Sequence, residues 1–398
     1  MRVVIINTDY GPFLRGLYDG DPGLRQASYG EQMRKRNETL FGGADFYSRH
    51  FIALGHQAWD VHANNGVLQA TWFKSHALKP GNKKKSFLER LHHTFFGSAE
   101  ASSIPPRPPH PSPLRSPIEP SDIDLEGILV EQVRALKPDV VLNQAVSEIE
   151  SRVLHQMRPA AKLIVGQIAS PYPEEETYTA YDMMVSSLPN FVQYYRSRGL
   201  AAERVLLGFE PTVLDRIGTA DRDIDVSFVG SLTPDHGTRF RLLERLASET
   251  DIAIWGRLAS VPEQSPIMRR YRGEAWGRDM FRVLARSKIA INHHIDIAEN
   301  YANNMRLFEA TGMGALLITD WKDNIAELYE PGKEVVCYRS AEECIDLIRY
   351  YRTHEAERIA IAAAGQRRTL KDHTYASCVT HLARLFAERL AVPAPPGH

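Results

Sequence analysis

Hydrophobic runs separated by helical patterns recur along most of the chain. The run RVVIIN at residues 2–7 is followed by a long polar stretch that we expect to form a loop. A helical pattern over 43–54 and a short hydrophobic run at 57–63 come next. The rhythm then continues with helices predicted at 122–136 and 147–157 and strands at 139–143, 162–168, 181–187 and 205–209. Apolar strands with little polar alternation, separated by helices, are typical of a parallel sheet covered on both faces.

The same rhythm restarts at Asp225. Strands are predicted at 225–231, 251–256, 288–294, 315–319 and 334–338, and helices at 238–248, 277–286, 323–329 and 341–351, with one more beginning near residue 303. The pattern therefore indicates an α/β fold with two Rossmann-like domains. We place them at 1–212 and 213–375, followed by an amphipathic helix and tail at 376–398 that is suited to packing back on the first domain.

Residues 74–120 differ in composition from the rest of the chain. They contain three consecutive lysines at 83–85, a possible helix at 86–96 and a proline-rich run at 102–120. Such a segment cannot bury enough apolar surface to order itself throughout, so we expect a flexible insertion. The alternative is that the basic and aromatic residues of 83–96 rest on a membrane that carries a lipid-linked acceptor.

Charge and composition exclude several classes of protein. The chain has 398 residues, 43% of them hydrophobic, and 48 Lys and Arg against 49 Asp and Glu. A net charge of −1 recruits no nucleic acid, so an anionic ligand must be bound locally. The start of the chain lacks the pattern of a signal peptide, and the three cysteines show no metal spacing. We therefore expect a cytoplasmic protein with reduced thiols.

The stretch NNMRLFEATGMGALLITD at 303–320 carries the most informative chemistry. The first turn of a helix presents unpaired N–H groups that favour an anion, and Arg306 adds a forked donor suited to phosphate. Glu309 follows three residues later on the same face, where it can pair with Arg306 or accept hydrogen bonds from ribose hydroxyls. In isolation this pattern also suits a capped helix with a local ion pair.

Other predicted strands of the second half also end in candidate ligand-binding residues. Ligands bind beyond the carboxyl ends of the strands in open α/β sheets, so these loops should converge on one site. Two of the loops contain glycines that let a ligand approach the backbone. The residues concerned are Gly230, Ser231, Trp255, Gly256, Arg257, Asn292 and His293, with Arg239 near the start of the next helix.

Two common classes of nucleotide-binding enzyme are disfavoured. No GxGxxG follows the first strand and no GxxxxGK[ST] occurs, which argues against nicotinamide dehydrogenases and P-loop enzymes. His293 and His294 with Asp296 invite a metal interpretation, but adjacent side chains on a strand point to opposite faces. We therefore expect no metal site and no cofactor.

Four stretches can be compared with known families: FGGADFYSRHFIALGHQAWDV at 41–61, the connector at 182–214, NMRLFEATGMGALLITDWKDNIAELYEPGKEVV at 304–336 and DHTY at 372–375. These stretches resemble GT-B glycosyltransferases of family 4 and related enzymes, in particular the CgeB-like group. The resemblance implies two Rossmann-like domains facing across a cleft and metal-independent transfer from a nucleotide-sugar donor.

Carried over by position, the resemblance assigns Glu309 to the donor ribose and Gly230 with Ser231 to the diphosphate. The chain departs from the family pattern where Tyr301 stands in place of an earlier glutamate and where a lysine after the first strand of the second domain is missing. Sugar contacts would then pass to Asn303 and Asn304. The predicted donor site comprises Gly230, Ser231, Arg239, Trp255, Gly256, Arg257, Asn292, His293, Asn303, Asn304, Arg306, Leu307 and Glu309.

The implied activity is transfer of a sugar to a hydroxyl of a glycan or lipid-linked acceptor, as in bacterial surface polysaccharide synthesis. Arg306 would stabilise the leaving diphosphate. The predicted acceptor site comprises Asp9, Tyr10, Gly11, Gly42 and Gly43. An inverting enzyme needs a general base, for which Asp9 is the first candidate and Asp45 the second, although each also suits a capping role. A retaining enzyme needs no such base.

Two other functions fit the same residues. A nucleotide-sugar epimerase of the same architecture would process the donor without any acceptor. A catalytically silent glycan-binding subunit would assist a partner enzyme. Slow release of nucleoside diphosphate from the donor, faster with an acceptor, distinguishes a transferase from both.

Overall fold

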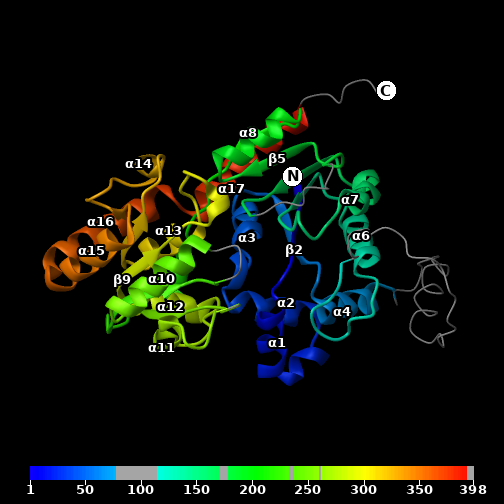
Figure 1. Cartoon of the computed structure of the whole chain (residues 1–398). Helices are drawn as coiled ribbons and strands as arrows, with labels where there is room; N and C mark the ends of the chain where they lie inside the picture. The colour runs from blue at the N-terminus through cyan, green and yellow to red at the C-terminus, as the bar shows by residue number, and fades with distance from the viewer. Residues whose placement is uncertain (78–113, 171–177, 233–236, 260, 392–398) are drawn as a thin grey trace, which may run out of the picture.

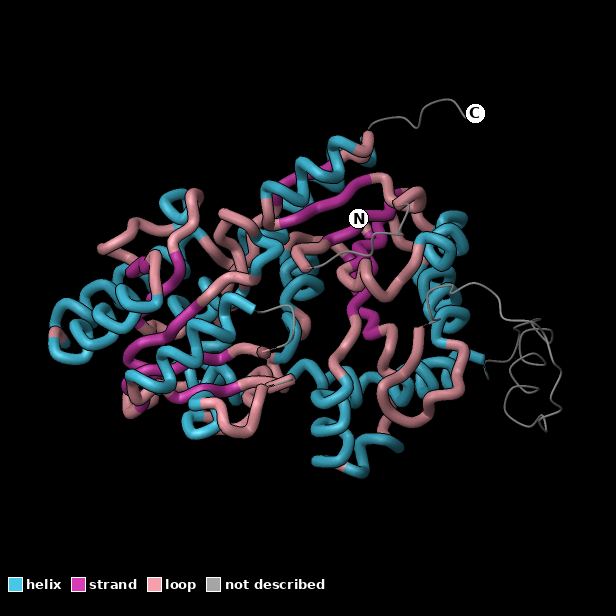
Figure 2. The backbone as a smooth tube through the Cα atoms, viewed as in Figure 1, coloured by secondary structure: helices cyan, strands magenta, loops and turns pink. Residues whose placement is uncertain are grey.

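The computed structural model describes residues 1–77, 114–170, 178–232, 237–259 and 261–391. The described chain contains two parallel sheets with helices packed around them (Figures 1 and 2). The first sheet has the order β2-β1-β3-β4-β5-β6 and the second β11-β10-β9-β7-β8. Their strands are β1 (Arg2–Asn7), β2 (Gln57–His62), β3 (Val140–Asn143), β4 (Leu163–Gln167), β5 (Met183–Ser186), β6 (Ala202–Arg204), β7 (Ile224–Val229), β8 (Ala253–Trp255), β9 (Ser287–Asn292), β10 (Leu316–Asp320) and β11 (Val336–Tyr338). The predicted architecture of two Rossmann-like sheets is confirmed.

Helices connect the strands in both halves. Those of the first half are α1 (Gly11–Gly20), α2 (Tyr29–Glu38), α3 (Phe46–Ala53), α4 (Gly66–Ala77), α6 (Leu125–Leu136), α7 (Ser151–Met157) and α8 (Pro189–Ser197). Those that follow are α9 (Thr212–Ile217), α10 (Gly237–Glu249), α11 (Pro266–Arg270), α12 (Arg278–Arg286), α13 (Met305–Gly312), α14 (Ile325–Leu328), α15 (Ala341–Thr353), α16 (Glu355–Asp372) and α17 (Tyr375–Ala391).

The first strand shows why apolar runs without alternation became central strands. Val3 and Ile5 pack into one hydrophobic cluster, whereas Val4 and Ile6 pack into another on the opposite face of the sheet. All four side chains are fully buried. Successive side chains of a strand point to opposite faces of the sheet. When helices cover both faces, neighbouring positions along the strand must therefore both be apolar.

Both sheets change direction at their first strand. β1 pairs with β2 on one side and with β3 on the other, and β7 likewise pairs with β8 and β9. The loops that leave β1 and β3 therefore diverge to opposite faces of the sheet, as do those that leave β7 and β9. Such points of divergence are the usual ligand sites of open α/β sheets.

Two segments join the halves. The backbone of Phe209 accepts a hydrogen bond from the N–H of Tyr375 and donates one to the carbonyl of His373, at 3.0 and 2.8 Å. After this crossing, α17 packs against α3 and β4 of the first half (Figure 1, red). Its Phe386 ring stacks on Phe51 with centroids 6.0 Å apart. The C-terminal helix thus returns to the first half as predicted, while the predicted domain boundaries stay predictions.

Some local predictions were wrong. The segment after β1 that we expected to be a polar loop contains α1 and α2. Hydrophobic periodicity did not predict α2, because this helix begins at a Ser28 cap and buries the polar side chains of Gln32 and Arg36 rather than an apolar stripe. The run at 205–209 is not a strand; β6 ends just before it, and the Phe209 ring lies against Gly312 of α13.

The predicted insertion is described only at its two ends. α4 continues to Ala77, and Leu114 and Ile118 are buried in the core of the first half. The predicted helix at 86–96 and membrane contact at 83–96 lie outside the described residues. Among the helices that the structure describes, none is both long and apolar enough to cross a membrane.

Candidate functional site

A cavity of about 590 Å³ lies between the two sheets. Its walls include residues that follow β1, β3 and β4 in the first half and β7, β8 and β9 in the second. The cavity therefore opens where both sheets change direction, which is the place expected for a ligand that both halves share.

Arg306 is held at the cavity wall by contacts on two sides. Its Nε donates to the carbonyl oxygen of Val229, the last residue of β7, at 2.9 Å. Its Nη1 lies 2.7 Å from a carboxylate oxygen of Glu309, without the geometry of a hydrogen bond. The guanidinium is thus fixed in place while some of its donors remain available to an anion.

Arg239 brings a second positive charge to the same wall. Its Nη1 and Nη2 donate to the backbone carbonyls of Ser231 and His293 at 3.1 and 2.7 Å, which ties the loops after β7 and β9 together. The side chain is 8% exposed and forms no ion pair within the described ranges. Burial lowers its pKa to about 10. A buried guanidinium without a carboxylate partner favours an anionic ligand nearby.

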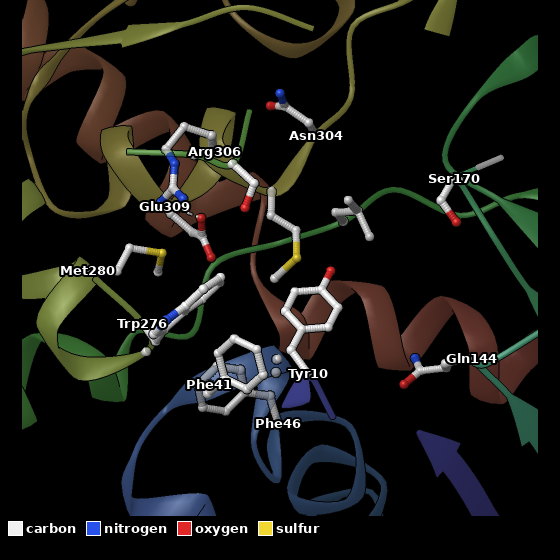
Figure 3. Close-up of a pocket in the computed structure, with 18 of the residues that line it drawn as sticks. Tyr10, Phe41, Phe46, Gln144, Ser170, Trp276, Met280, Asn304, Arg306 and Glu309 are labelled. Carbon is white, nitrogen blue, oxygen red and sulfur yellow. Dashed lines mark ion pairs between the residues drawn. The ribbon is translucent and has the colours of Figure 1, made fainter. Parts of the chain in front are cut away.

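Glu309 lies beside Arg306 on α13 (Figure 3). The residue is 6% exposed, and burial raises the pKa of its carboxyl although the charge of Arg306 opposes the rise. The carboxylate lines the cavity, where it can accept hydrogen bonds from sugar hydroxyls.

The two asparagines ahead of α13 differ in position. Asn304 lines the cavity and caps the helix by accepting from the N–H of Leu307 at 3.2 Å, while its Nδ2 donates to Asn292 at 2.9 Å. Asn303 does not line the cavity; it is buried and donates to the carbonyl of Ser187 at 3.0 Å. The proposed sugar contact therefore suits Asn304, whereas Asn303 joins the two halves. Leu307 is fully buried and lies off the cavity wall.

The loop after β8 reaches the cavity through its glycine. A Cβ on Gly256 would lie 2.1 Å from the carbonyl oxygen of Gly230, and its φ of +140° already disfavours a side chain. Gly230, Ser231 and Gly256 line the cavity, but the neighbouring Trp255 and Arg257 do not. Trp276, before α12, supplies an indole to the wall instead.

The adjacent histidines have different partners. His293 lines the cavity, and its ring nitrogens lie 2.9 Å from the hydroxyl of Tyr338 and 3.4 Å from that of Thr238. Burial lowers the pKa of His293, which favours the neutral ring at pH 7. His294 is buried, with Nδ1 2.7 Å from Asp320. The described residues contain no group of three or more His, Cys, Asp or Glu arranged to hold a metal ion.

The opposite wall of the cavity is rich in aromatic side chains. Tyr10 is 60% exposed, and its ring makes edge contacts with Phe41 and Trp276 at centroid distances of 5.6 and 5.9 Å (Figure 3). Gly42 and Gly43 also line the cavity, with φ values of +56° and +79° that favour glycine. Gly11 does not line it.

Asp9 lies off the cavity wall, in a buried charge cluster. One carboxylate oxygen is 2.6 Å from Arg36 Nη2 and the other 3.3 Å from His62 Nδ1, and the Asp9 side chain is inaccessible to solvent. Burial alone would raise the pKa of Asp9, but Arg36 and His62 outweigh it and hold the pKa well below its ordinary value. A base must reach the acceptor hydroxyl, so this position suits a structural role instead.

Asp45 also lies off the cavity, paired with Arg49 at 2.6 Å. Glu210 does line the cavity: its carboxylate lies 2.6 Å from His50 Nε2 and accepts from the hydroxyl of Thr212 at 2.8 Å. Burial alone would raise the pKa of Glu210, but these hydrogen bonds and the charge of His50 lower it. Neither predicted base therefore reaches the cavity in this structure.

Sequence reasoning missed a group of polar residues after β3 and β4. Gln144, Ser147 and Glu148 follow β3, and Gln167 ends β4. Both strands were predicted correctly, and the rule that ligands bind beyond their carboxyl ends applies to the first sheet as it does to the second. That signal was therefore present in the sequence.

A known protein family matches most of the second half of the chain. Residues 239–384, which include α13 and β9, match a family model described as glycosyl transferase-like. A comparison of the sequence with curated proteins gives no significant match.

Solved structures match the whole described arrangement of two sheets. Anabaena HepE in complex with UDP and glucose has a TM-score of 0.55 and 12% identity, covering 98% of this chain and 100% of that one. The chain has the GT-B fold. Sucrose-phosphate synthase from Thermosynechococcus elongatus gives a TM-score of 0.54 and 11% identity, covering 98% of this chain and 99% of that one. An α-glucosyltransferase solved with UDP-glucose and DNA gives 0.58 and 11%, covering 97% and 99%.

The GT-B fold places the cavity between the halves, where Arg239, Arg306 and Glu309 form one wall and Tyr10 and Phe41 belong to the other. The predicted GT-B architecture is confirmed, and the CgeB-like subgroup stays a prediction.

Proposed function

We propose that the protein is a glycosyltransferase that takes its sugar from a nucleoside diphosphate donor. The proposal rests mainly on one observation: Arg306 and Arg239 both line the same wall of the cavity, beside the first turn of α13. Both arginines are held by backbone carbonyls, so they are preorganised to receive a diphosphate. The glycosyl transferase-like model over 239–384 supports the same assignment.

A UDP-sugar is the first donor to test. HepE and the α-glucosyltransferase share the fold and were solved with UDP-glucose. In this proposal Glu309 accepts hydrogen bonds from the donor ribose, and Gly230, Ser231 and Gly256 let the diphosphate approach the backbone. Trp276 offers an aromatic surface at the same wall.

The reaction joins an acceptor hydroxyl oxygen to the anomeric carbon as the bond from that carbon to the diphosphate breaks. The diphosphate leaves with the electron pair, and the products are a glycoside, a nucleoside diphosphate and one proton. Arg306, Arg239 and the N–H groups of α13 stabilise the negative charge that develops on the leaving group. We propose a metal-independent mechanism without a cofactor because these cationic groups can balance that charge.

For the acceptor we propose a hydroxyl of a glycan or lipid-linked glycan, as in bacterial surface polysaccharide synthesis. The enzyme would act in the cytoplasm, and peripheral membrane contact through residues 83–96 stays the alternative to a flexible insertion. The aromatic and amide side chains with which the first half lines the cavity support a carbohydrate in that part of it.

Turnover of UDP-glucose tests the activity. The purified protein is incubated with the donor alone and with a panel of sugar acceptors, and UDP and the sugar are quantified. A transferase releases UDP slowly in water and faster with an acceptor, whereas an epimerase changes the sugar. If the protein binds the nucleotide but neither releases UDP nor changes the sugar, it is a binding subunit.

A further inference from the structure

The two walls of the cavity differ in charge. Every basic side chain among the described lining residues comes from the second half, namely Arg239, His293 and Arg306. We define the first-half wall by the lining residues from Asn7 to Ser170. Its described members include no lysine, arginine or histidine. A phosphate on a bound acceptor would find no cationic partner on this wall.

The first-half wall instead offers aromatic surfaces and oriented amides. Gln144 Nε2 donates to Gln167 Oε1 at 2.7 Å, and Gln167 Nε2 donates to the hydroxyl of Tyr47 at 2.9 Å. These hydrogen bonds fix both amides and leave further donor and acceptor capacity on them. Tyr10 adds an exposed ring at the centre of the cavity (Figure 3). Flat apolar surface beside oriented amides suits a ring compound that bears hydroxyl groups.

Glu148 is the carboxylate that remains available there. Among the described lining residues the carboxylates are Glu148, Glu210 and Glu309. Glu309 pairs with Arg306, and Glu210 is held by His50 and Thr212. Glu148 is exposed to solvent and forms no ion pair within the described ranges. Although Glu148 is exposed, nearby protein atoms displace part of the solvent around its carboxyl and raise its pKa.

Tyr10 lies within electrostatic reach of both Glu148 and a cation. Burial raises the pKa of Tyr10, the charge of Glu148 raises it further, and the charge of Arg257 lowers it. Arg257 does not line the cavity, but its charge reaches Tyr10 on the first-half wall. It is therefore a cation to test as the partner of a phosphorylated acceptor.

We propose that the first-half wall binds an uncharged, hydroxyl-bearing ring compound, such as an unphosphorylated sugar or glycoside, and that Glu148 accepts a hydrogen bond from its hydroxyl. The proposal rests on the glycosyltransferase function and narrows its acceptor. A carboxylate in this position attracts a hydroxyl donor and repels a phosphate, so Glu148 selects between the two classes.

The test compares two classes of acceptor. The donor is UDP-glucose, or a sugar conjugate of whichever nucleoside diphosphate the protein binds. One class consists of 4-nitrophenyl glycosides, and the other of the corresponding sugar phosphates. UDP release above the rate in water is measured for the wild type, Glu148→Gln, Arg257→Ala and the control Glu150→Gln. Glu150 is two residues away, is paired with Arg152 and does not line the cavity.

We expect uncharged glycosides to stimulate UDP release and sugar phosphates not to. Glu148→Gln should lower kcat/KM for the glycoside about 10- to 100-fold, the range for a hydrogen bond to a charged group, and leave nucleotide binding and hydrolysis in water unchanged. Glu150→Gln should match the wild type, and Arg257→Ala should keep the preference for glycosides over sugar phosphates.

Three results overturn the proposal while nucleotide binding persists. They are stimulation by sugar phosphates, whether or not it disappears in Arg257→Ala, stimulation by neither class, and an unchanged kcat/KM in Glu148→Gln. If the folded wild-type protein binds no nucleoside diphosphate, the glycosyltransferase assignment itself fails.

Discussion

The Nη1 of Arg306 lies 2.7 Å from the carboxylate of Glu309, one turn further along α13. Arg306 is also anchored to β7 through Val229, so one arginine connects a helix, a strand end and the cavity. In the proposed function, the pair supplies positive charge for the diphosphate and a hydrogen-bond acceptor for a sugar hydroxyl. This arrangement leads to a specific expectation for nucleotide affinity.

Replacing Arg306 by alanine should weaken UDP binding more than UMP binding. The charged hydrogen bonds lost with the second phosphate are worth about 1.5–3 kcal/mol, or about 10- to 100-fold in Kd. Calorimetric titration of both nucleotides measures the difference. Arg282→Ala, which removes an exposed arginine on α12 paired with Asp279, is the matched control. Equal losses for UDP and UMP would remove Arg306 from the diphosphate site.

Asp9→Asn should destabilise the fold by about 3–5 kcal/mol, because it leaves the guanidinium of Arg36 buried without its partner. Urea denaturation gives the free energy of unfolding. The double variant Asp9→Asn with Arg36→Met should recover part of the loss, since the unpaired charge is gone. A stable Asp9→Asn protein that has lost only transfer activity would instead support Asp9 as a base.

Gly256→Ala should lower stability and UDP affinity more than Gly273→Ala, because Gly256 lies in the cavity loop after β8. Both glycines have positive φ, at +140° and +97°, but a Cβ on Gly273 meets nothing within 4 Å whereas one on Gly256 meets the Gly230 carbonyl. The strained φ alone costs about 1–3 kcal/mol in either variant. Any further loss of unfolding free energy in Gly256→Ala therefore measures the clash with the Gly230 carbonyl. Denaturation and UDP titration measure both effects, and similar results for the two variants would contradict the close approach.

Glu210 should make stability depend on pH in the acid range. Its pKa is lowered from the ordinary value of 4.5, so its carboxylate stabilises the folded state above about pH 4.5 and this stabilisation is lost as pH falls below it. Acidification from pH 7 should therefore lower the melting temperature of the wild type more than that of Glu210→Gln. Glu203→Gln, from an exposed ion pair with Arg196, should follow the wild type. Parallel curves for all three proteins would count against the lowered pKa.

The second half was the easier part to predict from sequence. Its strands are apolar without alternation, and Gly230, Asn292 and Arg306 follow or face their carboxyl ends, so local pattern and topology agree. The resemblance extended from the same segment to the GT-B architecture, which the structure confirms.

The first half was harder because its functional positions depend on tertiary partners. Asp9 follows β1 as a ligand-binding residue would, but Arg36 and His62 approach it from distant parts of the chain and bury it. No local sequence pattern predicts the contacts of Asp9 with Arg36 and His62. Likewise α2 buries Arg36 on an otherwise polar helix, which hydrophobic periodicity cannot detect.

The most direct test of the central claim is thermal stabilisation by UDP, GDP, dTDP and CDP in the wild type, Arg306→Ala, Glu309→Ala and the control Arg282→Ala. A nucleoside diphosphate bound between Arg239 and Arg306 should raise the melting temperature of the wild type and the control selectively, and the rise should disappear in the two site variants. No shift with any of the four nucleotides in a well-folded wild-type protein would contradict the donor site.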